Sequence, residues 1–148
     1  MIIREADLAI DAGQIMVGAR NFVERVAFKS MIPKDETVFS RAVGRIISLS
    51  GFELLLAEHE DRVVGGIGIL YTPYQWNPEI IVAEELFWWA AEDAPYRTGY
   101  LLIEEAMKRI TERNAIPVFR KLTTSPDGVK KLYAKYGMTQ VETVFARI

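Results

Sequence analysis

The stretch that most constrains this chain runs from Glu84 to Asn114, EELFWWAAEDAPYRTGYLLIEEAMKRITERN. Its first part, Ala83 to Ala91, is apolar and aromatic without a 3.6-residue period, as expected for a strand buried on both faces. Pro95 lacks a backbone donor, so regular strand pairing is expected to stop near Asp93. The sequence therefore predicts a buried strand that breaks at Pro95 and leads into a helix.

The helix is expected to begin near Thr98, because apolar residues then recur at spacings of three and four along one face. The first amides of a helix have no partner inside it, and a glycine here allows close approach of a ligand. The connection between the strand and the helix therefore predicts an anion-binding site. The alternative is an ordinary strand-to-helix turn that binds nothing. Its residues are Arg97, Thr98, Gly99, Tyr100 and Leu101.

Composition excludes several classes of function. The 148 residues suit one domain, and 18 basic against 20 acidic residues give a net charge of -2, which argues against nucleic acid as the main partner. The absence of cysteine excludes disulfides and thiolate metal sites, and the single His59 excludes a multi-histidine zinc site, so no metal is expected. No apolar run approaches the roughly 20 residues of a membrane span, and MIIREAD does not resemble a signal peptide. We therefore predict a soluble, cytoplasmic domain.

Capping residues, periodicity and turn signals predict the remaining elements. In chain order these are a strand at residues 1–5, a helix capped by Asp7, a helix from about residue 35, a hairpin of strands 52–58 and 63–71, an aromatic loop at 71–78, a strand at 117–124, a helix with Ser125 as its N-cap, and a strand at 138–148. Gly65, Gly66 and Gly68 indicate a bulge, a close approach, or simple loosening of their strand. The order predicts an α+β fold with a mixed, mostly antiparallel sheet flanked by helices.

This order, with three local patterns, resembles the GNAT superfamily of acyl-CoA-dependent N-acetyltransferases. IREADLAIDAGQI is similar to the first strand and helix of the family, and ELLLAEHEDRVVGGIGIL to its second and third strands. LYAKYGM, Leu132 to Met138, is similar to its leucine-tyrosine pair with the following glycine. The resemblance implies a single GNAT-like domain over residues 1–148. The family signature Arg/Gln-x-x-Gly-x-Gly/Ala is incomplete, because aligning either Arg97 or Gly99 with it recovers only part of the motif.

The resemblance implies acetyl-CoA as a co-substrate, with its pantetheine arm between the fourth and fifth strands. The backbone of Trp88, Trp89 and Ala90 would pair with that arm, although the two tryptophans also suit core packing. The cofactor phosphates would lie at residues 97–101, with Lys130 among the nearby cations. A solvated basic face is the alternative for those cations.

Acetyl transfer to an amine needs a base for the nucleophile and an acid for the leaving thiolate. Glu84 and Glu85 are the candidate bases, because partial burial raises the pKa of a carboxyl group. Neighbours in a strand point to opposite faces, so at most one of them can face the cleft. An ion-paired carboxylate at a strand edge is the alternative for each. The resemblance implies Tyr133 as the acid, and an aromatic residue packed against the sheet is the other interpretation.

The predicted function is transfer of an acetyl group from acetyl-CoA to a primary amine by direct attack in a ternary complex. The acceptor is a small-molecule or protein amine, and nearby acidic residues favour a cationic one. These residues are Glu84, Glu85, Glu92 and Asp93. A homodimer is compatible with the sequence.

Two other functions remain open at this stage. A catalytically inactive GNAT-like domain that binds acyl-CoA or a partner protein is suggested by the incomplete signature and the loop YTPYQWNP. Nucleic-acid binding through a basic cluster is disfavoured by the net charge. That cluster comprises Arg120, Lys121, Lys130, Lys131 and Lys135.

Overall fold

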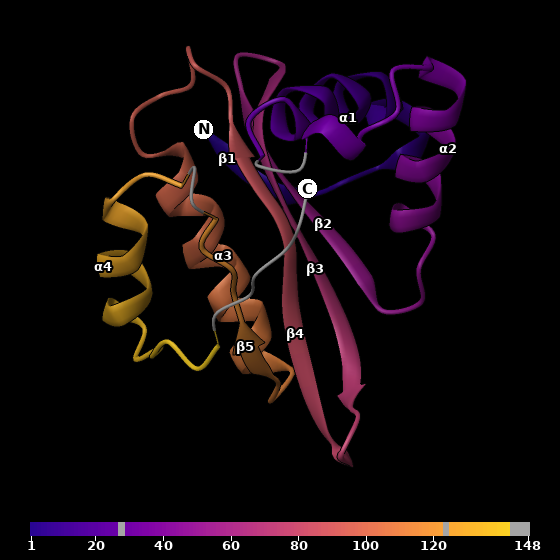
Figure 1. The fold of residues 1–148 in the computed structure, drawn as a ribbon. Coiled ribbons are helices and arrows are strands. Elements are labelled where there is room, and N and C mark those ends of the chain that lie inside the picture. Colours follow the sequence, from indigo (N-terminus) through magenta and orange to yellow (C-terminus); the bar gives the residue numbers. More distant parts are fainter. Residues whose placement is uncertain (27–28, 123–124, 143–148) are drawn as a thin grey trace.

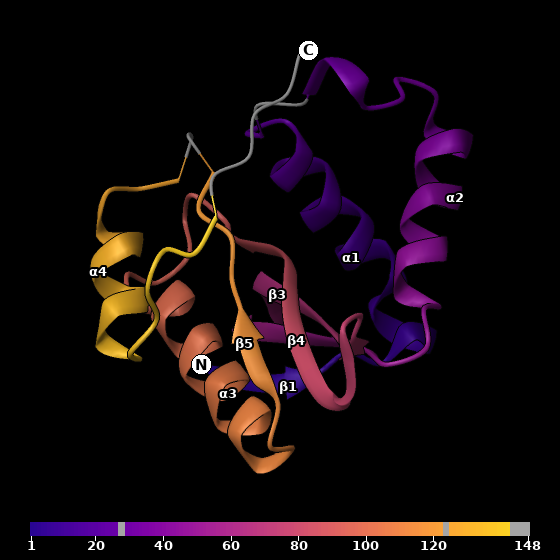
Figure 2. The same cartoon turned by 60° about the horizontal axis from the view of Figure 1, so that its bottom comes forward.

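The computed structural model describes residues 1–26, 29–122 and 125–142. In chain order its elements are β1 (Ile2–Glu5), α1 (Leu8–Val23), the 3-10 turn η1 (Lys29–Met31), α2 (Glu36–Ile47), β2 (Phe52–His59), β3 (Arg62–Tyr74), β4 (Asn77–Ala90), α3 (Thr98–Glu112), β5 (Ile116–Val118) and α4 (Gly128–Lys135). Figure 1 shows α1 and α2 on one side of a twisted sheet and α3 and α4 on the other. Figure 2 shows the same layers after rotation. None of the helices in these described ranges is both long and apolar enough to cross a membrane.

The sheet has the order β1-β2-β3-β4-β5 and is mixed and mostly antiparallel, which confirms the predicted α+β fold. Its first three pairings are antiparallel, and the pairing of β4 with β5 is parallel. That parallel contact is short, because it joins only Val82–Glu84 to Ile116–Val118. β4 continues to Ala90, so its last six residues, 85 to 90, have no β5 partner in the described ladder.

Alternation along β2 divides the core into two layers. Leu55 is fully buried in the cluster between the sheet and α3, whereas Leu54 and Leu56 belong to the cluster with Ile15 of α1. Successive strand residues point to opposite faces, so one strand supplies both layers. The α3 layer is the larger and includes Tyr133 of α4, which ties that helix to the sheet.

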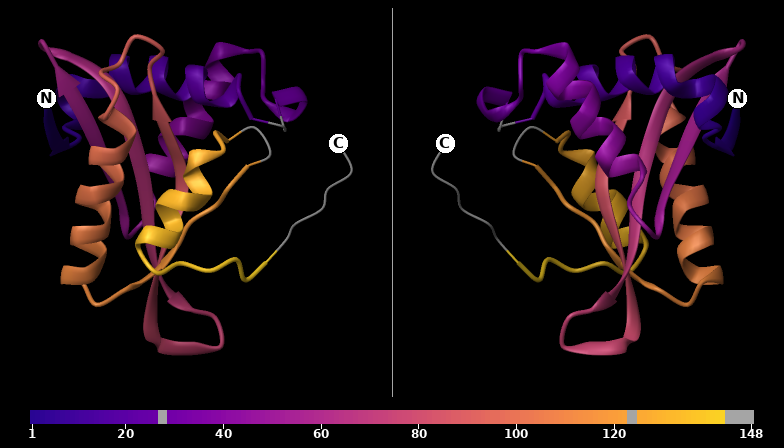
Figure 3. Two further views of the ribbon diagram at one scale, coloured as in Figure 1. Left: turned by 90° about the vertical axis from the view of Figure 1, so that its left-hand side faces the viewer. Right: turned by 90° about the vertical axis from the view of Figure 1, so that its right-hand side faces the viewer.

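The predicted aromatic loop at residues 71–78 is wrong, because these residues form the end of a β-hairpin. β3 continues to Tyr74 and β4 starts at Asn77. The prolines at 73 and 78 fit because β2 pairs with β3 only as far as Leu70, and β5 meets β4 only from Val82. A proline is tolerated where the outer edge of a strand has no ladder partner. The hairpin projects beyond the rest of the sheet (Figure 3), and Trp76 at its turn is 78% exposed.

The last part of the chain differs from the prediction in three places. Of the strand predicted at 117–124, the described residues form only β5 (Ile116–Val118), and residues 123–124 lie outside the described part. The predicted N-cap Ser125 is wrong, because Asp127 is the N-cap residue and the Ser125 hydroxyl instead accepts the Leu122 amide at 3.0 Å. Of the strand predicted at 138–148, residues 138–142 are not a strand, and residues 143–148 lie outside the described part.

Candidate active site

A β-bulge in β4 marks the place where the sheet opens. Gly68 of β3 faces Phe87, whereas the next residue, Ile69, faces Glu85, so Leu86 is an extra residue in β4. A bulge bends its strand and increases the local twist. The bulge follows directly after Glu84, the last β4 residue that pairs with β5. The bulge therefore accounts for the divergence of β4 from β5.

Beyond the bulge, backbone groups of β4 face the opening. The Ala91 amide donates to the Val64 carbonyl at 2.9 Å, which fixes the alternation of groups in this part of the strand. The amides and carbonyls of Trp88 and Ala90 consequently point away from β3, whereas those of Trp89 point toward it. In agreement with this direction, Arg25, two residues after α1, donates to the Ala90 carbonyl at 3.4 Å.

The two tryptophan side chains lie on opposite faces of the sheet. Trp89 packs against Gly18 of α1 and against Gly66, where an added Cβ would lie 2.9 Å from its indole nitrogen. Gly66 of β3 thus leaves space for the Trp89 indole ring. The sequence predicted such a close approach as one explanation for the glycines of this strand. Trp88 instead lies on the α3 face, where a Cβ on Gly99 would come within 3.1 Å of its ring. Trp89 is therefore a packing residue, while Trp88 borders the start of α3.

The two adjacent carboxylates have different environments. The Glu85 residue is 5% exposed, and its Oε2 accepts the Arg120 backbone amide at 3.1 Å. Burial raises the pKa of Glu85 to about 7, although the amide and the positive charge of Arg120 oppose that increase. The side chain of Glu84 is 33% exposed and accepts from Arg120 Nη2 at 2.8 Å. Glu84 therefore has the ion pair that was considered for either residue, and Glu85 is the buried carboxyl group.

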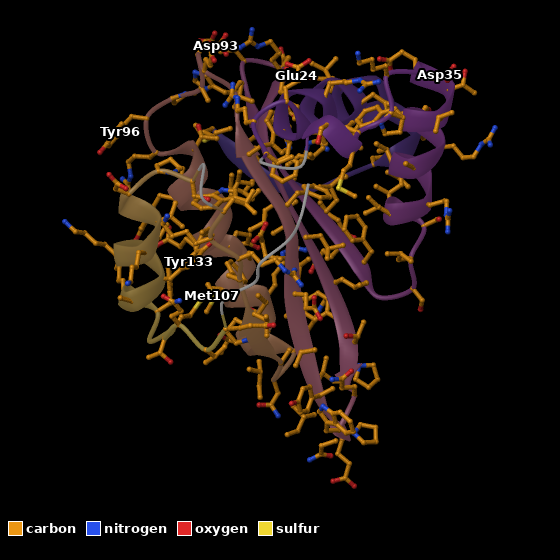
Figure 4. All side chains as sticks on the ribbon, in the orientation of Figure 1. Glu24, Asp35, Asp93, Tyr96, Met107 and Tyr133 are labelled. Atoms are coloured by element: carbon orange, nitrogen blue, oxygen red, sulfur yellow. The ribbon has the colours of Figure 1, made fainter. Side chains whose placement is uncertain are left out.

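Tyr133 approaches the backbone of Arg120 from α4. Its hydroxyl donates to the Arg120 carbonyl at 2.9 Å, and its ring meets Phe119 edge-on with 5.7 Å between centroids. Burial raises the pKa of the Tyr133 hydroxyl, and the negative charge of Glu85 adds to the increase. Figure 4 shows Tyr133 extending from α4 toward the sheet. The backbone of Arg120 thus contacts Glu85 through its amide and Tyr133 through its carbonyl.

The start of α3 retains the features of the predicted anion site. Arg97 is the N-cap residue, and no side chain caps the helix. The buried Thr98 donates its hydroxyl to the Pro95 carbonyl at 2.7 Å, which fixes the first turn. Lys135 of α4 donates to the Tyr100 hydroxyl at 2.6 Å, and Arg97 lies over the Tyr100 ring, so two cations contact Tyr100 in the first turn of α3. Lys130 is exposed on α4.

The acidic residues after β4 are compensated by arginines. Asp93 accepts from Arg62 at 2.6 Å, and Glu92 accepts from Arg25 at 3.2 Å. These pairs weaken the negative field that was expected to attract a cationic amine. A cavity of about 330 Å³ lies between the end of α1 and these residues. Its lining residues are Asn21, Glu24, Arg25, Ala91, Glu92 and Asp93.

The structure brings together Glu85 and Tyr133 at one place, and Trp88 with residues 97–101 at another. Arg120, which connects the first pair, was predicted only as a member of a surface basic cluster. Its contacts with Glu84 and Glu85 depend on the parallel register of β5 against β4. In the sequence, Arg120 is only an arginine near the start of a predicted strand. That position does not indicate that it connects Glu85 with Tyr133.

Comparisons with known proteins support the fold. No family model matches the sequence, and no curated protein matches it. A transcriptional regulator from Bacillus halodurans C-125 is similar with a TM-score of 0.75 and 19% identity, over 99% of this chain and 98% of that chain. A ribosomal-protein-alanine N-acetyltransferase from Brucella melitensis biovar Abortus 2308 has a TM-score of 0.75 and 13% identity, over 100% and 99%.

A predicted acetyltransferase from Clostridium acetobutylicum, solved with acetyl-CoA, has a TM-score of 0.69 and 12% identity, over 99% of this chain and 95% of that chain. At such low identities the likeness shows the fold. The chain therefore has the fold of the GNAT acetyltransferases, as its sequence predicted.

Proposed function

We propose that this protein is an N-acetyltransferase that moves an acetyl group from acetyl-CoA to a primary amine. The observation that carries the proposal is the opening of β4 from β5 beside a buried carboxyl group and a buried phenol. Glu85 contacts the backbone amide of Arg120, and Tyr133 contacts its carbonyl, at the edge of that opening. Similar folds in a ribosomal-protein-alanine N-acetyltransferase and in a predicted acetyltransferase solved with acetyl-CoA support the assignment.

Acetyl-CoA fits the opening and the start of α3. The outward backbone groups of Trp88 and Ala90 would hydrogen-bond the pantetheine amides, as a further strand would. The uncapped first turn of α3 would hold the phosphate oxygens through backbone amides of residues 97–101. Arg97 and Lys130 would add positive charge to that end of the molecule.

In the proposed reaction the amine nitrogen attacks the thioester carbonyl carbon and loses a proton to Glu85, directly or through water. A pKa of about 7 suits a base that must be ionised near neutral pH yet still hold a proton. The carbon–sulfur bond then breaks, and the leaving thiolate takes the proton of Tyr133. That proton is directed at the Arg120 carbonyl in this structure, so the hydroxyl must rotate during the transfer.

A protein-binding module without catalysis is the second candidate, and the β3–β4 hairpin favours it. Trp76 is 78% exposed and Tyr74 is 42% exposed on this projecting segment. Exposed aromatic residues of this kind are enriched at protein interfaces. The two candidates differ in whether acetyl-CoA is consumed.

Calorimetric titration with acetyl-CoA, CoA and a desphospho analogue at fixed salt tests the proposal first. We expect micromolar binding that weakens when the phosphate is removed. A Gly99→Glu variant should bind acetyl-CoA more weakly while remaining folded, and Gly99→Ala controls for displacement of Trp88 alone. Release of CoA in the presence of a screened amine then establishes catalysis. Absence of acetyl-CoA binding would reject the enzyme and favour the hairpin as the functional surface.

A further inference from the structure

Arg120 makes four contacts where the β4–β5 ladder has already ended. Its amide donates to Glu85 Oε2 at 3.1 Å and its carbonyl accepts from the Tyr133 hydroxyl at 2.9 Å. Its guanidinium donates to the Glu85 carbonyl at 2.9 Å and to Glu84 Oε2 at 2.8 Å. We propose that Arg120 is a positioning residue that fixes the end of β5 against the bulge of β4 and thereby orients both Glu85 and Tyr133. This inference rests on the proposed acetyl transfer.

The geometry explains why a side chain is needed at this position. Pairing of the two backbones stops at Glu84 and Val118, and the extra residue Leu86 turns β4 away from β5. Backbone groups of the two strands then no longer form a ladder. The long Arg120 side chain reaches the β4 carbonyl that a ladder amide would otherwise bond, and its planar guanidinium holds a carboxylate at the same time.

Through its backbone, the same residue sets the position of the phenol. The ring of Tyr133 packs on Phe119 while its hydroxyl bonds to Arg120, so two consecutive residues after β5 hold both ends of this side chain. A displacement of the segment would move Tyr133 and Glu85 together. Misplacement of catalytic groups by about 1 Å can lower a rate by about a hundredfold.

Arg120 also acts on the charge of Glu85. Its positive charge and its amide both lower the pKa of that carboxyl group against the effect of burial. Tyr133 faces Glu85 from α4, and Glu84 precedes the bulge on the same strand. The side chain of Arg120 is 52% exposed, and exposed ion pairs contribute little to stability. Variants of Arg120 are therefore expected to fold.

The test compares Arg120→Gln and Arg120→Lys with the control Arg113→Gln. Arg113 likewise bonds a buried carboxylate, because its Nη1 lies 3.1 Å from Glu53 Oε2. Carbon-13 NMR of labelled glutamate carboxyl groups, assigned with Glu85→Gln, follows the titration of Glu85. We expect the Glu85 pKa to rise in Arg120→Gln, to stay near the wild-type value in Arg120→Lys, and to stay unchanged in Arg113→Gln.

Steady-state kinetics separates charge from geometry. Both Arg120 variants should lose about a hundredfold in kcat, with a smaller change in KM for acetyl-CoA. Only Arg120→Gln should shift the pH profile of kcat upward, since Lys retains the charge. Unchanged Glu85 titration and unchanged Tyr133 ring signals in Arg120→Gln would overturn the inference. Wild-type protein that acetylates no amine would reject the proposed function instead, and the NMR titration decides the positioning role in either case.

Discussion

Two buried carboxylates flank the same residue of the sheet and differ in almost everything else. Glu53 of β2 and Glu85 of β4 are both registered against Ile69 of β3, and they are 4% and 5% exposed. Arg109 lies 2.6 Å and Arg113 3.1 Å from Glu53. The Tyr71 hydroxyl also donates to Glu53 at 3.0 Å. Glu85 accepts one backbone amide, and no guanidinium bonds to its carboxylate in the described structure.

The comparison shows how compensation separates a structural carboxylate from a chemical one. A buried charge is costly unless opposite charges and hydrogen bonds compensate it, and Glu53 has both. The Glu85 carboxylate has one hydrogen bond from a backbone amide to offset its burial, and its pKa rises to about 7. The tyrosines near the two carboxylates, Tyr71 and Tyr133, differ in a similar way. Tyr71 donates directly to Glu53, whereas Tyr133 donates to a backbone carbonyl from which its proton can be redirected.

The largest expected effect comes from exchanging each carboxylate for an amide. Glu85→Gln should lower kcat by about 10²- to 10⁴-fold, because the amide cannot accept the amine proton. Glu53→Gln is the matched control and should leave kcat within a few-fold. Steady-state assays on both variants, after circular dichroism shows that they are folded, make the comparison. Equal losses in the two variants would show that Glu85 has no catalytic role.

The two phenols provide the next comparison. Tyr133→Phe should reduce kcat by about a hundredfold with little change in acetyl-CoA affinity, because only the proton donor is removed. Tyr71→Phe removes a hydroxyl that bonds Glu53 and should affect stability alone. Measuring kcat and the calorimetric affinity for both variants tests this expectation. A loss of affinity that matches the loss of rate would place Tyr133 in cofactor binding.

Truncation of Glu53 should lower the free energy of unfolding, whereas the changes at Glu85 and Tyr133 are expected to lower kcat. Glu53→Ala removes the shared partner of Arg109 and Arg113, whose side chains are 24% and 49% exposed. Because these guanidinium groups keep some contact with water, we expect a loss of about 2–3 kcal/mol, below the value for a fully buried pair. Urea denaturation measures it. A loss below about 0.5 kcal/mol, the usual size for a surface change, would show that the network does not stabilise the sheet.

The sequence predicted those parts of the molecule that depend on local signals. Asp7 caps α1 as predicted, and the helix expected from about residue 35 begins at Glu36. Glu60 and Asp61 form the predicted turn between β2 and β3, with positive φ. The projecting hairpin was missed because its prolines indicate a loop unless the free edges of both strands are known.

The candidate site was predicted only in part. Alternation showed that Glu84 and Glu85 face opposite ways, but it could not show which of them is buried, because β5 and the bulge at Leu86 decide that. Glu53 and Glu85 lie opposite Ile69 on its two neighbouring strands. This arrangement involves three strands, so it cannot be deduced from spacing along the chain. Roles that depend on register, such as that of Arg120, therefore require the structure.

The smallest expected effect is on the pH dependence of the free energy of unfolding, which should differ between variants of Glu85 and Glu53. The pKa of Glu85 is about 7 in the folded state against 4.5 for an ordinary glutamate. Between these values the folded protein holds a proton that the unfolded chain has released, so the free energy of unfolding falls as pH rises from about 4.5 to 7. The shift of about 2.5 pKa units sets an upper bound of about 3 kcal/mol, and we expect about 1–3 kcal/mol after relaxation.

Glu85→Gln removes this loss, because an amide stays neutral while its oxygen still accepts the Arg120 amide. The variant should therefore be more stable than the wild type at pH 8 and similar to it at pH 4.5, although it is inactive. Glu53→Gln should show no such gain at pH 8, since it gives up two guanidinium partners. Urea denaturation of the three proteins at both pH values measures the difference. A stability gain at pH 8 combined with lost turnover would mean that the protein keeps Glu85 for chemistry at the expense of stability, whereas a loss at pH 8 would place Glu85 with Glu53 among the structural carboxylates.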